Sequence, residues 1–202
     1  MLVDCSLKPT TNNALLKVVE KFCECTVVHF SNIEVGQVGA DMDAVILSGS
    51  AARIVEPSDR RLFQGTIDLI KSCSLPMLGI CFGHQLLSWS FGAEVGSLAQ
   101  PVLNRFEQVR LVNADELFAG FNEKETVLLA ENHYDYVLKE SLSRNGLILL
   151  ADSASCEVEA VRHKSRPVYG VQFHPERVEI ESQSHLGGHR IIENFFNNVV
   201  KR

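Results

Sequence analysis

The sequence predicts an α/β protein: one domain over residues 1–202, built on an open, mostly parallel sheet with helices on both faces. Three observations predict this class. Strand-like and helix-like stretches alternate through the first half of the chain, which is typical of parallel sheets covered on both sides. Two polar motifs each follow a short apolar run, as expected at the carboxyl ends of buried strands. The 202 residues, 46% of them hydrophobic, suffice for one substantial core.

The first half of the chain supplies the alternation. Strands are predicted where short apolar or β-branched runs end in polar residues, and helices where apolar residues recur every three or four positions. In order, these are a strand from Leu2 to Cys5, a helix from Asn12 to Phe22, a β-rich run from Thr26 to Phe30, a strand from Ala44 to Leu47, a helix capped by Ser58 and ending at Lys71, a strand from Met77 to Ile80, and a helix to about Phe91.

The second half is richer in β-like segments. They lie near Gln108 to Val112, Thr126 to Ala130, Leu147 to Ala151, Val158 to His163 and Val168 to Phe173. A closing helix from about Gly188 to Val200 carries apolar residues at helical spacing, which predicts a core-facing helix. Before it, Arg177 to Gly187 is predicted to be irregular, either a mobile solvent loop or a lid or partner contact.

Cys81 is the most prominent candidate nucleophile. It stands in LGICFGHQ, residues 78–85, directly after a strand-like run and directly before a helix-like one. A tight strand-to-helix turn holds a nucleophile at the end of a sheet, and Gly79 and Gly83 keep the flanking backbone free of side chains. Taken alone, a cysteine here is also explained as a small core residue.

A second motif, VYGVQFHPE at residues 168–176, supplies a base. His174 ends a strand-like run, and Glu176 follows two residues later. A thiol that attacks a carbonyl needs a base, and the base needs a group that fixes its tautomer. Taken alone, this motif is also explained as a loop with a solvated acid. Two motifs at two strand ends favour a Cys81–His174–Glu176 triad.

Both motifs resemble those of the class I glutamine amidotransferases, and the resemblance runs over nearly the whole chain. Residues 79–85 are similar to the family's nucleophile motif and residues 170–176 to its His-x-Glu motif. Residues 151–178 most resemble the glutaminase subunit or domain of GMP synthase. The resemblance implies a flavodoxin-like, doubly wound fold, no cofactor and no metal.

The reaction that the resemblance implies is hydrolysis of the glutamine side-chain amide through a Cys81 glutamyl thioester. Ammonia would pass to a separate synthase subunit, since this chain is too short for a synthase domain as well. The acceptor pathway implied first is guanine nucleotide synthesis, with anthranilate, aminodeoxychorismate or another synthesis as alternatives. The tetrahedral intermediates need preorganised donors, which the resemblance places on the amides of Phe82 and Ser50.

The turn after the strand at residues 44–47 departs from the family pattern. The family usually carries a glycine- and proline-rich loop there, whereas this chain has SGSAA at residues 48–52. Ser50 keeps an amide but has less conformational freedom than glycine. Ser50 is therefore either a tolerated variant in an ordinary turn, or part of a loop that a partner must reorganise.

Substrate contacts are also carried over from the resemblance. Gly49 belongs to the same turn, and Gln85 lies one helical turn after Cys81 on the same face. Residues 131–135, ENHYD, match a Ser-His-x-Asp stretch that holds the substrate in related glutaminases. Asn132 and Tyr134 depart from that pattern, and a structural hydrogen bond at a buried strand edge is the favoured alternative for His133.

Two other functions stay open on the sequence. One is a stand-alone γ-glutamyl hydrolase or peptidase that uses the same triad. The other is a regulatory subunit whose catalysis is impaired by the altered turn. The intact triad residues argue against the second function.

Composition excludes several classes of partner. The net charge is −6 with no basic cluster, so a nucleic-acid surface is not expected. No long apolar run or basic leader indicates a membrane segment or a secretory signal, and we expect a cytoplasmic protein. The six cysteines are then expected as thiols. Cys23 and Cys25 lack a second ligand pair and are expected to pack at a helix end.

Overall fold

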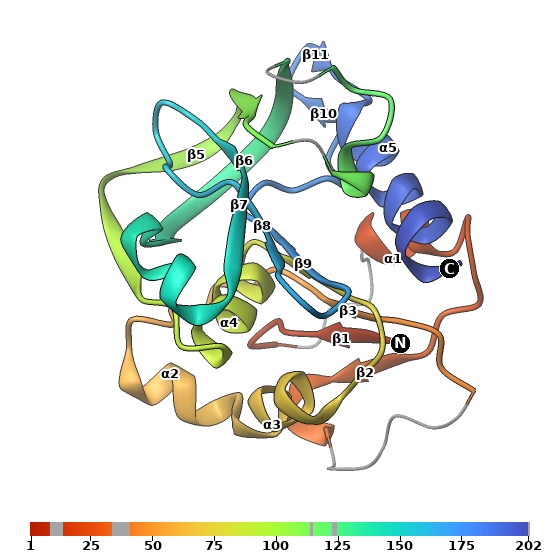
Figure 1. The fold of residues 1–202 in the computed structure, drawn as a ribbon, viewed down its shortest axis with the longest axis vertical. Coiled ribbons are helices and arrows are strands. Elements are labelled where there is room, and N and C mark those ends of the chain that lie inside the picture. The colour runs from red at the N-terminus through yellow and green to blue at the C-terminus, as the bar shows by residue number, and fades with distance from the viewer. Residues whose placement is uncertain (9–13, 34–40, 114, 123–124, 202) are drawn as a thin grey trace.

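A nine-stranded open sheet forms the centre of the protein. The computed structural model describes residues 1–8, 14–33, 41–113, 115–122 and 125–201. The strand order is β2-β1-β3-β4-β9-β8-β7-β5-β6, and helices lie on both faces of the sheet (Figure 1). The predicted α/β class with an open, doubly covered sheet is confirmed.

One half of the sheet is parallel. Its strands are β2 (Val27–His29), β1 (Leu2–Asp4), β3 (Val45–Leu47), β4 (Met77–Ile80) and β9 (Val168–Val171). Every neighbouring pair among them runs in the same direction. All residues of β1, β3, β4 and β9 are buried, as expected for parallel strands covered on both faces.

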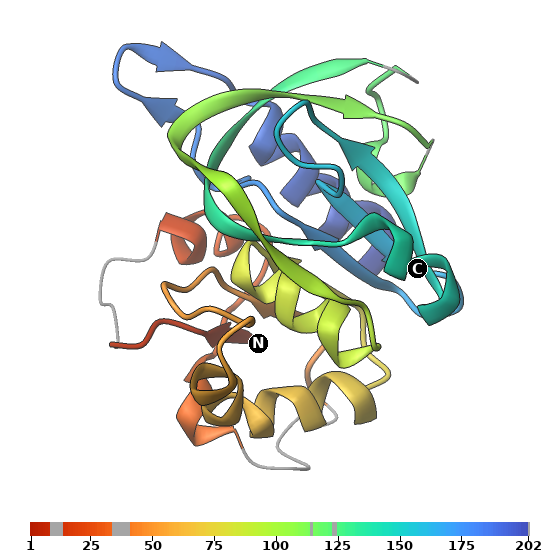
Figure 2. The same cartoon turned by 90° about the vertical axis from the view of Figure 1, so that its left-hand side faces the viewer.

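The other half is antiparallel, so the sheet as a whole is mixed. It consists of β8 (Ala160–His163), β7 (Leu147–Asp152), β5 (Val95–Leu111) and β6 (Thr126–Val137). These strands pair antiparallel with their neighbours. The long β5–β6 pair sweeps across the molecule (Figure 2) and carries one wall of the site described below.

The helices form two apolar layers. On one face, α1 (Ala14–Val19), α5 (Gly187–Asn194) and its π-helical continuation Phe195–Val200 pack on the sheet. On the other face lie α3 (Gln64–Ser72) and α4 (Phe82–Ser90). The short helices are α2 (Pro57–Leu62) and the 3₁₀ turns η1 (Phe30–Asn32), η2 (Glu116–Phe118), η3 (Lys139–Ser141) and η4 (Ser143–Asn145). Within the described ranges, no helix has the length and apolarity needed to cross a membrane.

The predicted helix ends need correction. Residues 12 and 13 lie outside the described residues, and α1 ends at Val19, before the predicted Phe22. The helix predicted from Ser58 to Lys71 is two helices: Glu56 is the N-cap of α2, and Pro57 begins it, because the proline ring preorganises a first helical turn. The break lies at Phe63, whose buried ring stacks 4.1 Å from that of Phe30, so tertiary packing determines the boundary.

The two longest strands, β5 and β6, extend beyond the segments predicted for them. The predicted segments 108–112 and 126–130 are parts of β5 and β6, which begin or end far beyond them. The missed part of β5 is mostly exposed and mixes apolar and polar residues, and the missed end of β6 buries Glu131, His133 and Asp135. Neither stretch has the apolar alternation that predicts a strand. The predictions for β7, β8 and β9 are correct to within two residues.

The prediction that residues Arg177 to Gly187 are irregular is wrong for the centre of this segment. Residues there form a small antiparallel hairpin of β10 (Glu179–Ile180) and β11 (Gln183–Ser184). The ring of His185, just after the hairpin, lies 4.6 Å from the ring of Phe106 in β5. The segment is therefore packed against strand β5. The following helix buries Ile191, Phe195 and its other predicted apolar residues, as expected.

Candidate active site

Cys81 occupies a strained turn between β4 and α4. Its φ and ψ are 51° and −108°, a conformation that a residue with a side chain rarely adopts and that costs about 1–3 kcal/mol. Its N–H donates to the carbonyl of Val171 at 2.8 Å, which ties the turn to the end of β9. The fold holds this strain at the carboxyl edge of the sheet, as a nucleophile elbow does.

The glycines around Cys81 allow elements to approach closely. A Cβ on Gly79 would lie 2.5 Å from the Gly83 carbonyl oxygen, and one on Gly83 would lie 2.4 Å from the Leu47 oxygen. A Cβ on Gly170 would lie 2.3 Å from a ring nitrogen of the buried His84. Side chains at these positions would therefore push α4 away from the strand ends that it packs against.

His174 follows β9 and reaches the same edge. Its N–H donates to the carbonyl of Ala130 in β6 at 2.7 Å, and its Nδ1 lies 2.8 Å from Oε1 of Glu176. This contact leaves Nε2 as the ring nitrogen available to Cys81. Gly49 fits between the two catalytic candidates, because a Cβ there would lie 3.1 Å from His174 Cε1 and 3.6 Å from Cys81 Cβ.

The charges around His174 favour its protonated form. Burial acts to lower the pKa of His174, but the Cys81 thiolate and the Glu176 carboxylate raise it, to about 10 overall. Opposite charges a few ångströms away stabilise the charged form of a group, and an imidazolium in turn stabilises a neighbouring thiolate. The arrangement is therefore suited to a thiolate–imidazolium pair oriented by Glu176.

Ser50 and Phe82, whose backbone amides are the predicted oxyanion donors, line the same cavity as Cys81. The N–H of Phe82 is in the first turn of α4, where backbone N–H groups have no acceptor within the helix. Ser50 lies in the turn after β3, where its Oγ accepts from the N–H of Ala52 at 3.0 Å. The same turn is fixed by Ser48, whose Oγ accepts from Cys5 N–H at 2.9 Å.

A cavity of about 400 Å³ opens in front of Cys81. Its volume is within the usual range for small-molecule sites. It is lined by Ser50, Ala51, Ala52, Arg53, Cys81, Phe82, Gln85, Asn132, His133, Tyr134, Asp135 and His174. The structure thus brings together predicted residues from four separate segments of the chain. Glu176 and Gly49 are outside this lining and contact or adjoin His174.

Gln85 lies in the cavity wall and is almost fully buried. Its Nε2 donates to the Asp135 carbonyl at 2.7 Å and to Oε1 of Gln172 at 3.0 Å. Both amide hydrogens are used inside the protein, so only its oxygen is left for a ligand. A contact of Gln85 with substrate stays a prediction, limited to that oxygen.

The segment predicted to bind substrate is the end of β6. The Asn132 carbonyl lies 3.8 Å from Cys81 Sγ, and the Tyr134 side chain is 55% exposed. His133 is buried, its Nδ1 lies 3.0 Å from the Asp135 carbonyl, and burial lowers its pKa. This is the geometry expected if His133 makes a structural hydrogen bond and does not take part in catalysis.

The sequence interpretation missed an ion pair in the cavity wall. Arg53 and Asp135 form a bidentate pair, with Nη2–Oδ1 at 2.5 Å and Nε–Oδ2 at 3.1 Å, and Ser97 Oγ also donates to Asp135 at 2.8 Å. Asp135 lay at the edge of the predicted substrate segment. Arg53 had no sequence signal, because its partner is far along the chain.

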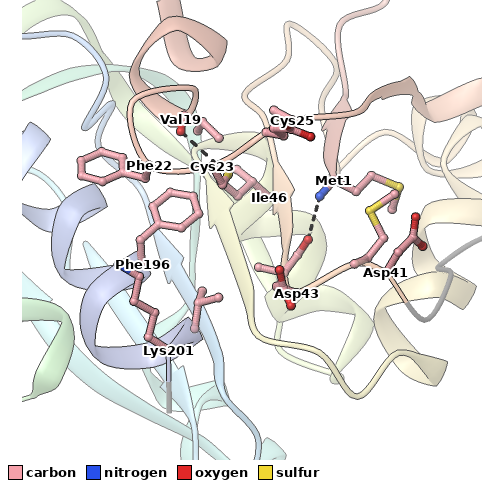
Figure 3. A pocket seen from close by; sticks show the side chains of 14 residues that line it. Met1, Val19, Phe22, Cys23, Cys25, Asp41, Asp43, Ile46, Phe196 and Lys201 are labelled. Carbon is pink, nitrogen blue, oxygen red and sulfur yellow. Dashed lines mark hydrogen bonds between the residues drawn. The ribbon is translucent and has the colours of Figure 1, made fainter.

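A second cavity of about 330 Å³ lies at the opposite, amino edge of the sheet, beside Met1 and Ala44 (Figure 3). Phe22 and Phe196 stack there at 5.3 Å. Cys23 Sγ donates to the Val19 carbonyl at 3.9 Å, but Cys23 is exposed. Only the half-buried Cys25 packs against the core, so the prediction that both thiols pack at a helix end is wrong for Cys23.

The chain matches the sequence model of the family Glutamine amidotransferase class-I over residues 1–199. It is 33% identical over 160 residues to the glutamine-hydrolyzing GMP synthase subunit of Methanothermobacter thermautotrophicus, covering 79% of this chain and 76% of that one. It is 39% identical over 137 residues to the protein of the same name from Archaeoglobus fulgidus, covering 67% of each.

Solved structures agree with these sequence matches. A Thermoplasma acidophilum protein described as a GMP synthase subunit superposes with a TM-score of 0.81 at 25% identity, covering 96% of this chain and 91% of that one. A glutamine amidotransferase of Thermotoga maritima shares the fold, with a TM-score of 0.70 at 20% identity and coverage of 87% and 76%. With a family match over almost its entire length, the chain belongs to the class I glutamine amidotransferases.

Proposed function

We propose that this chain is the glutaminase subunit of a GMP synthase whose ammonia-using activity resides on a separate chain. The observation that carries the glutaminase assignment is the convergence of Cys81, His174 and Glu176 at one sheet edge, beside a cavity. The curated relatives named above, at 33% and 39% identity, support GMP synthase as the enzyme it serves.

In the proposed reaction, Cys81 Sγ attacks the side-chain amide carbon of glutamine. The carbonyl oxygen becomes a tetrahedral oxyanion, and the imidazolium of His174 protonates the departing nitrogen, which leaves as ammonia. Neutral His174 then takes a proton from water, which attacks the thioester and releases glutamate. Glu176 keeps Nδ1 as the donor and stabilises the imidazolium in both steps.

The Phe82 and Ser50 amides are the proposed donors to the oxyanion. Losing one such donor typically costs about 10²- to 10³-fold in rate. Gly49, Gln85, Asn132, His133 and Tyr134 are proposed to surround the rest of the substrate. Their support is that four of these residues line the cavity and that Gly49 lies close to both Cys81 and His174.

We also propose that one domain spans residues 1–202, supported by the family match over residues 1–199. The partner is proposed to be a synthase subunit that takes ammonia directly from this site. A reducing, intracellular location is supported by six cysteines that are all free thiols.

The test measures glutamate release from glutamine by the purified chain and by Cys81→Ala, each with and without the ammonia-using subunit of a GMP synthase and its substrates. We expect release that depends on Cys81 and GMP formation that depends on both chains. Release without GMP formation would keep the glutaminase and reject the partner. Release only from larger γ-glutamyl compounds would reject the glutaminase in favour of a hydrolase.

A further inference from the structure

The turn after β3 carries one of the two proposed oxyanion donors, the amide of Ser50. This turn, SGSAA at residues 48–52, contains no proline, a residue that would fix the backbone angle φ. Glycine at position 49 adds conformational freedom instead. An oxyanion donor has to be held in place before the reaction, so bonds from other parts of the protein must hold this turn.

Arg53, directly after the turn, is bonded through both its backbone and its side chain. Its N–H donates to Oδ2 of Asp59, in the first turn of α2, at 2.8 Å. Its guanidinium reaches strand β6, where Nε lies 3.1 Å from Oδ2 and Nη2 lies 2.5 Å from Oδ1 of Asp135. Nη2 also donates to Ser97 Oγ in β5 at 2.8 Å. Arg53 therefore joins the turn to the β5–β6 pair.

Asp135 is a shared attachment point for three walls of the cavity. Its carboxylate binds Arg53, at the end of the turn after β3. Its backbone carbonyl accepts from Nε2 of Gln85, in α4, at 2.7 Å. Asp135 itself belongs to β6, opposite Ser97 of β5. The turn, the helix that follows Cys81 and the end of β6 thus meet at this residue.

Burial distinguishes this ion pair from an ordinary surface pair. The Asp135 side chain is 3% exposed, whereas that of Arg53 is 39% exposed. Exposed pairs contribute little to stability, but a buried carboxylate that loses its positive partner is left uncompensated. With a neutral residue at position 53, Asp135 would keep only the bond from Ser97 Oγ, at 2.8 Å. Loss of the pair would therefore favour movement of the turn away from β6.

We propose that Arg53 is a positioning residue of the glutaminase: by joining the turn after β3 to Asp135, it holds the Ser50 amide where the oxyanion forms. Arg53 acts through the turn and does not bind the reacting atoms. Its bonds supply the rigidity that a proline in the turn would supply. This inference rests on the proposed glutaminase function.

The first test measures kcat and KM for glutamine in wild type, Arg53→Gln and Arg53→Lys. Losing an oxyanion donor costs about 10²- to 10³-fold in rate. Because the Ser50 amide is displaced but still present, we expect Arg53→Gln to lose about 10- to 100-fold in kcat, with KM within about threefold of wild type. Lysine restores the charge without the planar fork of the guanidinium, so Arg53→Lys should recover part of the loss.

Arg110→Gln is the matched control. Arg110 also forms a bidentate pair, with Asp152, through bonds of 2.8 and 2.7 Å. That pair lies in the antiparallel half of the sheet, and neither residue lines the active-site cavity. We expect this variant to keep wild-type kcat. Thermal unfolding of each variant verifies that it is folded at the assay temperature.

A second measurement separates oxyanion stabilisation from substrate binding. The γ-aldehyde of glutamate adds to Cys81: a carbon–sulfur bond forms, the carbonyl electron pair moves to oxygen, and the thiol proton passes to His174. Its inhibition constant therefore reports on the oxyanion donors, whereas glutamine binding to Cys81→Ala reports on the substrate alone. We expect Arg53→Gln to weaken inhibition about 10- to 100-fold. In the Cys81→Ala background, Arg53→Gln should leave the Kd of glutamine within about threefold.

Several results would overturn the proposal. Wild-type kcat and aldehyde inhibition in folded Arg53→Gln would remove any role of Arg53. A loss confined to KM, or equal losses in aldehyde and glutamine binding, would make Arg53 a substrate ligand. An Arg110→Gln variant as impaired as Arg53→Gln would make the effect general. If wild type shows no Cys81-dependent release of glutamate, the proposed function fails; if it does and one of these results is found, only the inference about Arg53 fails.

Discussion

The two cavities at opposite edges of the sheet have similar volumes, about 400 and 330 Å³, and both contain thiols. At the carboxyl edge, Cys81 is held at φ 51° beside a histidine whose other nitrogen is bonded to a glutamate. At the amino edge, the exposed Cys23 donates to the Val19 carbonyl at the end of α1, beside stacked aromatic rings. We therefore expect a reactive thiol where backbone strain and polar groups converge, and neither cavity size nor the presence of a thiol is enough to predict one.

The topology explains this difference. At the carboxyl edge, the loops after parallel strands β3, β4 and β9 converge, and each contributes a residue to the site. At the amino edge, the chain enters the strands, and Met1 N donates to the Ala44 carbonyl at 2.8 Å. No histidine is among the described residues that line this cavity, so the second cavity is expected to affect stability and not catalysis.

The largest expected difference is in catalysis. Cys81→Ala should lower kcat for glutamine by about 10⁴-fold or more, because removing a nucleophile removes the covalent route. Cys23→Ala deletes a thiol of the other cavity. Because no histidine base is placed beside Cys23, we expect this variant to keep kcat within about twofold of wild type. Steady-state glutamate release measures both. Equal losses in the two variants would break the comparison.

The reverse pattern is expected for stability. Phe196→Ala removes a buried ring from the stack with Phe22 and should lower the free energy of unfolding by about 3–5 kcal/mol. Below its unfolding temperature, the variant should keep wild-type kcat. Leu186→Ala, at a side chain 68% exposed, is the control and should change stability by less than about 0.5 kcal/mol. Urea titration gives these values, and a large loss of kcat in folded Phe196→Ala would link the two cavities.

The charge on Glu176 should set the alkaline limit of activity. The pKa of His174 is raised to about 10, so its protonated form, which protonates the leaving nitrogen, is present below that pH and is lost above it. Glu176→Gln keeps an acceptor for Nδ1 but removes one of the two charges that raise the pKa. We expect kcat/KM to fall about 10- to 100-fold and its alkaline limb to move to lower pH. An unchanged pH profile would remove Glu176 from the triad.

The smallest expected effect concerns the turn after β3. Ser50→Gly removes the hydroxyl that accepts the Ala52 N–H and loosens the turn that carries a proposed oxyanion donor. We expect kcat of the isolated chain to fall by about two- to fivefold, on the scale of one neutral hydrogen bond. An increase would instead indicate that Ser50 restrains the turn until a partner binds. Comparing kcat with and without the synthase subunit separates the two cases.

The sequence predicted the parts of the site that depend on local pattern. Cys81 and His174 each follow an apolar run, so the topology of a parallel sheet was enough to expect them at one edge. The sequence did not predict the extension of β6. In that extension His133 and Asp135 are the inward-facing residues, and a strand is recognised by apolar residues at such positions. The Arg53–Asp135 pair joins two distant segments of the chain, and no local spacing indicates such a contact. The break at Phe63 likewise depends on rings from two other elements.

Covalent labelling tests the central claim most directly. The protein is incubated with a diazoketone analogue of glutamine, with or without excess glutamine, and the labelled cysteine is found by peptide mass spectrometry. The account predicts one equivalent of label on Cys81, protection by glutamine, and none on Cys23 or Cys25. Label on either of those thiols, or glutamine hydrolysis that persists when Cys81 is fully labelled, would contradict it.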